Sequence, residues 1–329
     1  MSNYKIETKC IQSGYTPKKG EPRVLPIYQS TTFKYDTSDQ MGRLFDLEDS
    51  GYFYTRLQNP TNDAVAAKIC DLEGGVGAML TSSGQAANFY AMFNICEAGG
   101  HIVASSAIYG GTYNLLGTTM KKLGIDCTFV SPEADEAELQ AAIRPNTKLI
   151  FGETISNPTL EVLDIELFAR VAHKNGIPLV VDNTFATPIN CRPFEFGADI
   201  VVHSTTKYMD GHATQVGGCI VDSGNFDWMA HKDKFPGLTT KDESYHGIIY
   251  AEKFGKMAYI TKCTTQLMRD LGSIPSPNNC FLLNLGLETL HLRMPRHCAN
   301  ALAVAKYLKN NEKVEWVNYP DLEGDKYHD

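Results

Sequence analysis

The 329-residue sequence has no uninterrupted apolar run of about 18 residues, the length that a membrane-spanning helix requires. Its nine cysteines include no C-x-x-C pair, and no cluster of His, Cys and carboxylate residues has the spacing of metal ligands. We therefore expect reduced thiols and no metal site. The first residues also lack the apolar stretch of a secretory signal, and we expect a cytoplasmic protein with no membrane partner.

Positive charge is not in excess. Thirty Lys and Arg residues face 38 Asp and Glu residues, which gives a formal net charge of −8. This balance gives no electrostatic reason to expect nucleic acid as a partner. The sequence also lacks G-x-G-x-x-G, and Gly74-Gly75-Val76-Gly77 precedes a predicted strand instead of following one, which argues against a dinucleotide site.

Short strand-like and helix-like patterns alternate after residue 63, which predicts an α/β fold with a mostly parallel sheet covered by helices. The predicted strands are Val76–Thr81, His101–Ala104, Cys127–Val130, Leu149–Gly152, Pro178–Asp182, Ile200–His203 and Val216–Val221. The predicted helices are Asp63–Glu73, Gln85–Ile95, Gly111–Leu123, Asp135–Ile143 and Asp164–Asn175. Turn-forming Gly and Pro residues before position 60 indicate an irregular arm.

A lysine follows one of these strands at the edge of the sheet where ligands bind in open α/β folds. The β-branched run that ends at Val202 is followed by Ser204, Thr206 and Lys207, so an amine lies beside two hydroxyl groups. Asp182 closes another predicted strand 25 residues upstream. Pyridoxal phosphate (PLP) needs a lysine for its Schiff base, donors for its phosphate and an acid at its pyridinium nitrogen. A single lysine after a strand is usually a solvated surface residue, and it is the coincidence of these groups that predicts a PLP site.

Four motifs occur in one order along the chain: Tyr54–Thr61, Ser82–Ala87, Val181–Thr184 and Ser204–Lys207. Together they resemble the Cys/Met-metabolism family of PLP enzymes, from about Thr8 to the last residue. The resemblance implies a fold-type-I PLP-dependent transferase with an N-terminal arm at 1–60, a large PLP-binding domain at 61–262 and a smaller α/β domain at 263–329. The last domain would be incomplete, because no arginine in these residues matches the family arginine that binds the substrate carboxylate.

The resemblance also assigns roles to side chains. Lys207 would hold the cofactor and move protons, Asp182 would pair with the ring nitrogen, Asn157 would bond the phenolic oxygen, and Tyr109 would stack on the ring and assist proton transfer. As an alternative, Tyr109 could be a packing residue and Asn157 part of an Asn-Pro turn.

The phosphate would lie where a strand passes into a helix, because unpaired N–H groups at a helix start bind anions. The residues expected there are Ser83, Gly84, Gln85, Ser204 and Thr206.

Tyr54 and Arg56 match family residues that reach the phosphate held by a neighbouring subunit. Arginine suits this task because its planar fork can give phosphate two hydrogen bonds. The resemblance therefore implies a homo-oligomer, a homotetramer built as a dimer of dimers. An ordinary surface arginine is the alternative for Arg56.

Residues 225 to 250 resemble an insertion that is typical of the O-acetylhomoserine sulfhydrylase branch of the family, and a variable surface loop is the alternative. Some methionine γ-lyases have a cysteine where this chain has Gly111. Both features favour γ-replacement on O-acetylhomoserine by sulfide or methanethiol, which yields homocysteine or methionine and acetate. Methionine γ-lyase and cystathionine γ-synthase or γ-lyase chemistry would use the same residues, and a non-catalytic binding protein of this fold is a remoter alternative.

The end of the sequence predicts two helices, Phe281–Arg293 and His297–Lys309, with a boundary or kink at Pro295. Val314–Val317 then has the composition of one edge strand.

Overall fold

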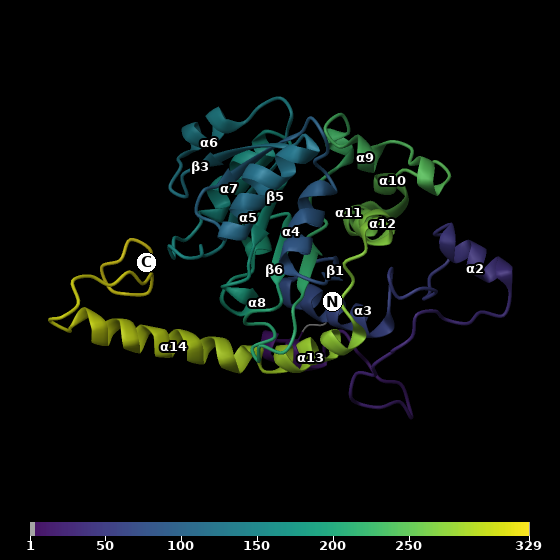
Figure 1. Ribbon diagram of the computed structural model, residues 1–329, viewed down its shortest axis with the longest axis horizontal. Helices are drawn as coiled ribbons and strands as arrows, with labels where there is room; N and C mark the ends of the chain where they lie inside the picture. Colours follow the sequence, from purple (N-terminus) through teal and green to yellow (C-terminus); the bar gives the residue numbers. More distant parts are fainter. Residues whose placement is uncertain (1–3, 329) are drawn as a thin grey trace.

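The computed structural model describes residues 4–328, and its centre is a seven-stranded sheet with the order β1-β7-β6-β5-β4-β2-β3 (Figure 1). The strands are β1 (Gly77–Thr81), β2 (His101–Ser105), β3 (Asp126–Val130), β4 (Thr147–Glu153), β5 (Leu179–Asp182), β6 (Ile200–Ser204) and β7 (Gly218–Asp222). All seven predicted strands are confirmed within two residues at each end. β7 runs antiparallel to both of its neighbours, and every other pair is parallel.

The register of the parallel strands brings their carboxyl ends to one edge of the sheet. Glu153 at the end of β4 lies opposite Asp182 at the end of β5, and Asp182 lies opposite Val202 of β6. Side chains that follow these strands therefore gather at the same edge, where an open α/β sheet binds its ligands.

Helices cover both faces of the sheet. The longer ones are α1 (Ile6–Gln12), α2 (Ser38–Phe45), α3 (Pro60–Glu73), α4 (Gly84–Phe93), α6 (Glu136–Ala142), α7 (Ile165–Lys174), α13 (Pro277–Glu288) and α14 (Leu290–Lys309). The shorter ones are α5 (Gly110–Asn114), α8 (Thr187–Asn190), α9 (Pro236–Thr239), α10 (Tyr250–Phe254), α11 (Ala258–Lys262) and α12 (Arg269–Leu271). The helix predicted at 111–123 begins as α5 and continues as a π turn at Leu115–Thr119 and a 3₁₀ turn at Met120–Leu123.

Two hydrophobic layers hold the helices to the sheet, because successive residues of a strand point to opposite faces. In β6, Ile200 and Val202 pack into one layer with α4, α7 and α11, whereas Val201 packs into the other with α1, α3, α13 and α14. Leu283 and Leu287 of α13 belong to the second layer. The apolar runs seen in the sequence are therefore strands buried on both faces, as expected for a covered parallel sheet.

The N-terminal arm divides into two parts. Its helix α1 packs into the second hydrophobic layer through Cys10, next to Val65 and Ile69 of α3. Beyond Gly14 the chain runs out from the body of the molecule and carries α2 at its far end (Figure 1). Within residues 4–59 the arm is thus irregular outside its two helices, α1 and α2.

Two expectations for the end of the chain are wrong. The boundary between the last two helices lies at Thr289, not at Pro295, which is inside α14. Thr289 lies between fully buried Leu287 and Leu290 and departs from helical backbone angles, with φ −108° and ψ 3°. Pro295 can remain inside α14 because it is exposed, where water can pair the carbonyl group that a proline leaves without its helical donor. The strand expected at 314–317 is also absent from the described residues, since no other strand lies beside this exposed segment to pair with it.

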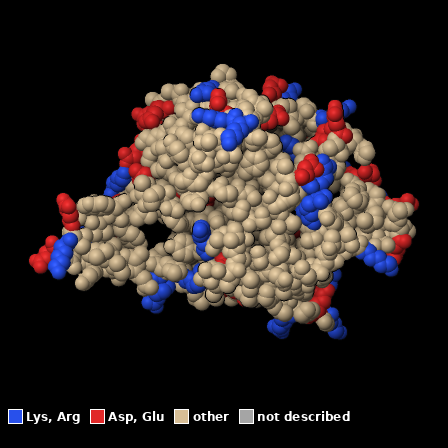
Figure 2. Space-filling model, in the orientation of Figure 1, with Lys and Arg blue, Asp and Glu red and all other residues tan. Residues whose placement is uncertain are grey.

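The boundary expected between residues 262 and 263 falls within a helical run, because α11 continues through a π turn at Cys263–Met268 into α12. The division into an arm and two domains stays a prediction. Within residues 4–328 no helix has the length and apolar character needed to cross a membrane. Charges of both signs are spread around the margin of the face shown in Figure 2, and neither sign dominates it.

Candidate active site

The loop that carries Lys207 leaves β6 at Ser204 and is held by its own hydrogen bonds. The Thr206 hydroxyl donates to the Gly217 carbonyl at 3.2 Å and accepts from the Gly217 N–H at 3.1 Å. Buried Asp210 accepts from the N–H groups of His212 and Thr214. The Lys207 side chain is exposed at the sheet edge. The backbone around the amine is thus fixed while the amine itself stays accessible.

Helix α14 clamps this loop from outside through Arg293. The guanidinium donates to the carbonyl oxygens of Tyr208 at 2.7 Å, Met209 at 3.4 Å and Gly286 at 2.7 Å. Burial lowers the pKa of Arg293 from its ordinary value, and the nearby charge of Asp210 opposes that shift. Arg293 therefore ties the residues directly after Lys207 to the two C-terminal helices.

Replacing Arg293 by methionine should lower the free energy of unfolding by about 3 kcal/mol, because hydrogen bonds from a charged donor are lost and carbonyl groups remain unpaired. Urea denaturation measures this change. The matched control is Arg296→Met, which removes an exposed arginine from the same helix and should leave the midpoint unchanged. Equal urea midpoints for Arg293→Met and Arg296→Met would show that the Arg293 hydrogen bonds do not stabilise the fold.

Asp182, the candidate partner of the ring nitrogen, is a buried carboxylate held from two sides. Its Oδ1 accepts from the Thr184 N–H at 3.0 Å and from the Thr184 hydroxyl, and the Asn88 amide of α4 lies 3.5 Å from Oδ2. Thr184 also accepts a hydrogen bond from the Ser204 N–H at 2.8 Å, which links Asp182 to the lysine loop. Burial raises the pKa of Asp182, and the hydrogen bonds from Thr184 act against it.

A second buried carboxyl group, Glu153, lies beside Asp182 in the strand register. Its Oε1 accepts from the Tyr109 N–H at 2.7 Å, and its Oε2 accepts from the Asn157 N–H at 3.3 Å. Burial, and then the charge of Asp182, raise the pKa of Glu153 to about 8. A cation at the Asp182 carboxylate would offset the repulsion between the two carboxylate charges, and a pyridinium N–H is such a cation.

The start of α4 closes against the end of β6. Ser83 caps the helix by accepting a hydrogen bond from the Ala86 N–H at 3.1 Å, and the first-turn N–H groups that follow it have no intrahelical partner. A Cβ at Gly84 would lie 2.6 Å from Ser204 Cβ, so only glycine lets the helix start approach the lysine strand this closely. Ser83, Gly84 and Gln85 therefore lie close to Ser204, and their role in binding a phosphate at this helix start stays a prediction.

Tyr109 lies at the same edge directly before α5, and the residue is 48% exposed. A Cβ at Gly111 would lie 2.5 Å from the Tyr109 ring and 2.9 Å from Gln85 Nε2, and Gln85 donates to the Thr112 hydroxyl at 3.3 Å. Glycine at 111 thus leaves room for the Tyr109 ring in its present position. A cysteine there, as in some methionine γ-lyases, would require the ring to move.

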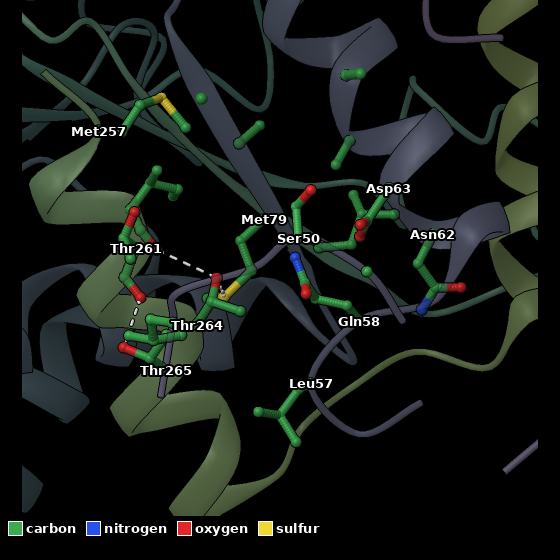
Figure 3. Close-up of a pocket in the computed structure, with 18 of the residues that line it drawn as sticks. Ser50, Leu57, Gln58, Asn62, Asp63, Met79, Met257, Thr261, Thr264 and Thr265 are labelled. Atoms are coloured by element: carbon green, nitrogen blue, oxygen red, sulfur yellow. Dashed lines mark hydrogen bonds between the residues drawn. The ribbon is translucent and has the colours of Figure 1, made fainter. Parts of the chain in front are cut away.

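Tyr54 and Arg56 lie elsewhere in this chain. The Arg56 guanidinium sits over the Tyr54 ring at 4.8 Å, and both residues line a cavity of about 1240 Å³ between the arm, α3, β1 and the helical run that contains α11. Figure 3 shows part of its lining, with Gln58, Asn62 and Asp63 facing Thr261, Thr264 and Thr265 across it. None of Ser83, Tyr109, Asp182 and Lys207 lines this cavity. One chain therefore does not bring all of the predicted cofactor residues together.

Sequence reasoning missed four side chains of this edge: Asn88, Glu153, Thr184 and Arg293. Thr184 bonds Asp182 two residues away and Glu153 bonds Asn157 four residues away, so the sequence carried a local signal for both. Their other partners, Ser204 and Tyr109, lie on other elements, and spacing along the chain does not reveal them. Arg293 is 86 residues from Lys207, and only the packing of α14 places it there. Across residues 4–328, no group of three or more His, Cys, Asp or Glu side chains could hold a metal ion.

The residues at this edge fit PLP. The site offers a buried carboxylate at a strand end, a helix start that approaches the lysine strand through Gly84, an accessible lysine and a partly exposed tyrosine. These are groups that such a cofactor uses. The fold and these groups define a PLP-dependent enzyme of the α/β class. In agreement, residues 7–329 match the sequence model of the Cys/Met metabolism PLP-dependent enzymes, and the chain belongs to that family.

Known proteins of the family are similar over nearly the whole chain. An O-acetyl-L-homoserine sulfhydrylase from Leptospira meyeri and a homocysteine synthase from Schizosaccharomyces pombe are each 46% identical, over 98% of this chain and 75% and 76% of their own lengths. The crystal structure of a putative O-acetylhomoserine (thiol)-lyase from Campylobacter jejuni, which contains N′-pyridoxyl-lysine-5′-monophosphate, superposes with a TM-score of 0.95 at 36% identity. That match covers 99% of this chain and 81% of the other. The family expected from the four motifs is confirmed.

Proposed function

We propose that this enzyme catalyses γ-replacement on O-acetylhomoserine, with sulfide or methanethiol as the acceptor and acetate as the leaving group. The observation that carries the proposal is the cluster of Lys207, Asp182, Tyr109 and the Gly84 helix start at one sheet edge, in a chain that is 46% identical to an O-acetyl-L-homoserine sulfhydrylase. The product would be homocysteine or methionine.

When bound, PLP supplies an electron sink for the carbanion that forms at the substrate Cα. The protein's residues do the rest. Asp182 would hold the proton on the ring nitrogen, because a buried carboxylate favours a cationic N–H group beside it. Lys207 would hold the cofactor and, once the substrate amine has replaced it, carry protons between Cα and the neighbouring carbon atoms. Asn157 would donate to the phenolic oxygen.

The phosphate would lie on the first turn of α4. Ser83, Gly84 and Gln85 offer backbone N–H groups there, and the positive end of the helix dipole favours an anion. The Ser204 hydroxyl lies next to Gly84 and would donate as well. Thr206 would contribute only if its hydroxyl exchanged its bond to the Gly217 carbonyl for one to phosphate.

Tyr54 and Arg56 would complete the site from a second subunit, and we propose a homo-oligomer, a dimer of dimers, for this reason. Two features support the idea: the pair lies on a cavity apart from Lys207, and the arm that carries it extends away from the body of its own chain (Figure 1). We further propose a cytoplasmic location, since all nine cysteines are free thiols.

The segment 225–250 is a packed part of the fold, not a loose loop. Phe235 is buried edge-on against Trp228, and Trp228 stacks on Tyr259 of α11. His246 contacts Asp46 near the end of α2 at 3.0 Å, so the segment also reaches the arm. This packing argues against a variable surface loop, and the 46% identity to an O-acetyl-L-homoserine sulfhydrylase supports the sulfhydrylase branch.

The holoenzyme should form homocysteine from O-acetylhomoserine and sulfide much faster than it releases α-ketobutyrate from methionine. Acetate leaves without the protonation that a thiolate needs, and Gly111 provides no cysteine beside Tyr109 to assist that step. Product analysis by chromatography with and without added sulfide measures both reactions. Faster breakdown of methionine would replace the sulfhydrylase assignment by methionine γ-lyase, and turnover of cystathionine or its formation would indicate the cystathionine enzymes.

A further inference from the structure

Glu153 has no role in the activity described so far, yet it lies at the centre of the site. It is the last residue of β4, is only 7% exposed and stands next to Asp182 in the strand register. A buried carboxyl group costs free energy unless its oxygens are paired. Both oxygens of Glu153 accept a hydrogen bond, and the two donors indicate what the residue does.

The two partners are backbone N–H groups of the residues proposed to touch the cofactor ring. Oε1 accepts from Tyr109 at 2.7 Å, and Oε2 accepts from Asn157 at 3.3 Å. Tyr109 lies in the loop after β2 and Asn157 in the loop after β4, so one side chain joins the ends of two strands. Because both oxygens face backbone amides, the carboxyl group is not directed at a reacting atom.

Tyr109 needs such an anchor. Its side chain is about half exposed, and it directly precedes α5, the first part of a helical run that passes into a π turn at Leu115–Thr119. No side-chain hydrogen bond caps that helix, and the bond from the Tyr109 N–H to Glu153 fixes the backbone just before it. Small displacements of groups that contact a reacting centre lower the rate strongly, so the anchor has a functional consequence.

We infer that Glu153 is a positioning residue, which holds Tyr109 against the face of the cofactor ring and Asn157 against its edge, beside Asp182. The inference rests on the proposed function, since it concerns the same cofactor site. Aspartate at this position would be too short to reach both amides. Glutamine would keep the length but place an NH₂ group against an N–H donor, so it can accept only one of the two bonds.

The test compares wild type with Glu153→Gln, Glu153→Asp and the control Glu161→Gln, which alters a carboxylate of the same loop. Cofactor is removed and restored, and the PLP dissociation constant, the absorption spectrum of the bound cofactor, kcat and KM are measured. We expect both Glu153 variants to bind PLP about 10–100-fold more weakly and to lose kcat by a similar factor, the range that loss of a supporting hydrogen bond costs at metal sites. The absorption maximum should shift, and Glu161→Gln should match wild type.

A double variant separates positioning from a general effect on folding. If Glu153 acts through Tyr109, the loss in kcat for Glu153→Gln combined with Tyr109→Phe should be smaller than the product of the two single losses. Independent, multiplicative losses, or Glu153 variants with unchanged PLP affinity and spectrum, would overturn the positioning role. Wild-type protein that binds no PLP would instead overturn the proposed function, and this inference with it.

Discussion

Replacing Lys207 by alanine should remove activity by a factor of about 10²–10⁴ or more, because the variant loses both the covalent attachment of PLP and the proton carrier at the reacting carbons. The exposed amine at the end of β6, beside Asp182 and Ser204, is the basis of this expectation. Borohydride treatment of the wild type followed by peptide mapping should place the reduced cofactor on Lys207. The control Lys122→Ala removes another exposed lysine and should retain full activity. A reduced adduct on a different lysine would refute the assignment.

The same variant tests whether sites are shared between subunits. Arg56→Ala should weaken PLP retention, because it removes a charge-assisted phosphate contact worth about 1.5–3 kcal/mol. If Tyr54 and Arg56 act on a neighbouring subunit, mixed dimers of Arg56→Ala and Lys207→Ala chains contain one intact site and recover activity. Verified mixed dimers without activity would argue against shared sites.

Asp182→Asn should lower kcat by about 10²–10³-fold, the usual cost of removing one preorganised group that stabilises developing charge. Asparagine fits the same space but cannot hold the ring nitrogen in its protonated form. A matched control is Asp222→Asn at the end of β7, which is equally buried but lies at the opposite edge, because β7 runs antiparallel to β6. Steady-state kinetics should show full activity for the control. Comparable losses of kcat in Asp182→Asn and Asp222→Asn would mean that Asp182 contributes only to the stability of the fold.

Asp182→Asn has a second consequence in the cofactor-free protein. The pKa of Glu153 rises from 4.5 to about 8, first through burial and then through the charge of Asp182. Between these values the folded state keeps a proton that the unfolded chain has lost, so stability falls as the pH rises through this range. Burial also raises the pKa of Asp182, so Asp182→Asn removes a second group that loses stability as the pH rises, together with the charge that helps to raise the pKa of Glu153. For both reasons the loss of stability between about pH 5 and pH 8 should shrink in the variant. Urea denaturation of wild type and variant at pH 5 and pH 8 measures the free energy of unfolding at each pH. The same change with pH in both proteins would contradict this expectation.

Local patterns predicted the elements of the large domain well. The strands at the centre of the sheet are buried on both faces, so their β-branched runs stand out from the surrounding sequence. The helix starts are marked as clearly: Ser83 and Asp164 each accept a hydrogen bond from the third residue of the helix that follows. The C-terminal part followed its local pattern less closely, because the helix boundary lies at Thr289 and Pro295 is accommodated in an exposed stretch of α14. Proline marks a helix boundary only by local preference, and an exposed helix face can accept it.

By itself the sequence determined the α/β architecture, the strand-end positions of Lys207 and Asp182, the helix start at Gly84 and the family, since each depends on residues close together in the chain. Only the tertiary structure decided which groups surround them. Glu153 meets Tyr109 because β2 and β4 are neighbours in the sheet, Arg293 meets the lysine loop because α14 packs against it, and Arg56 lies on a cavity apart from Lys207 because the arm extends outward. These contacts join residues about 40 to more than 80 positions apart, and a hydrogen bond between such residues is set by the packing of whole elements, which no local spacing encodes.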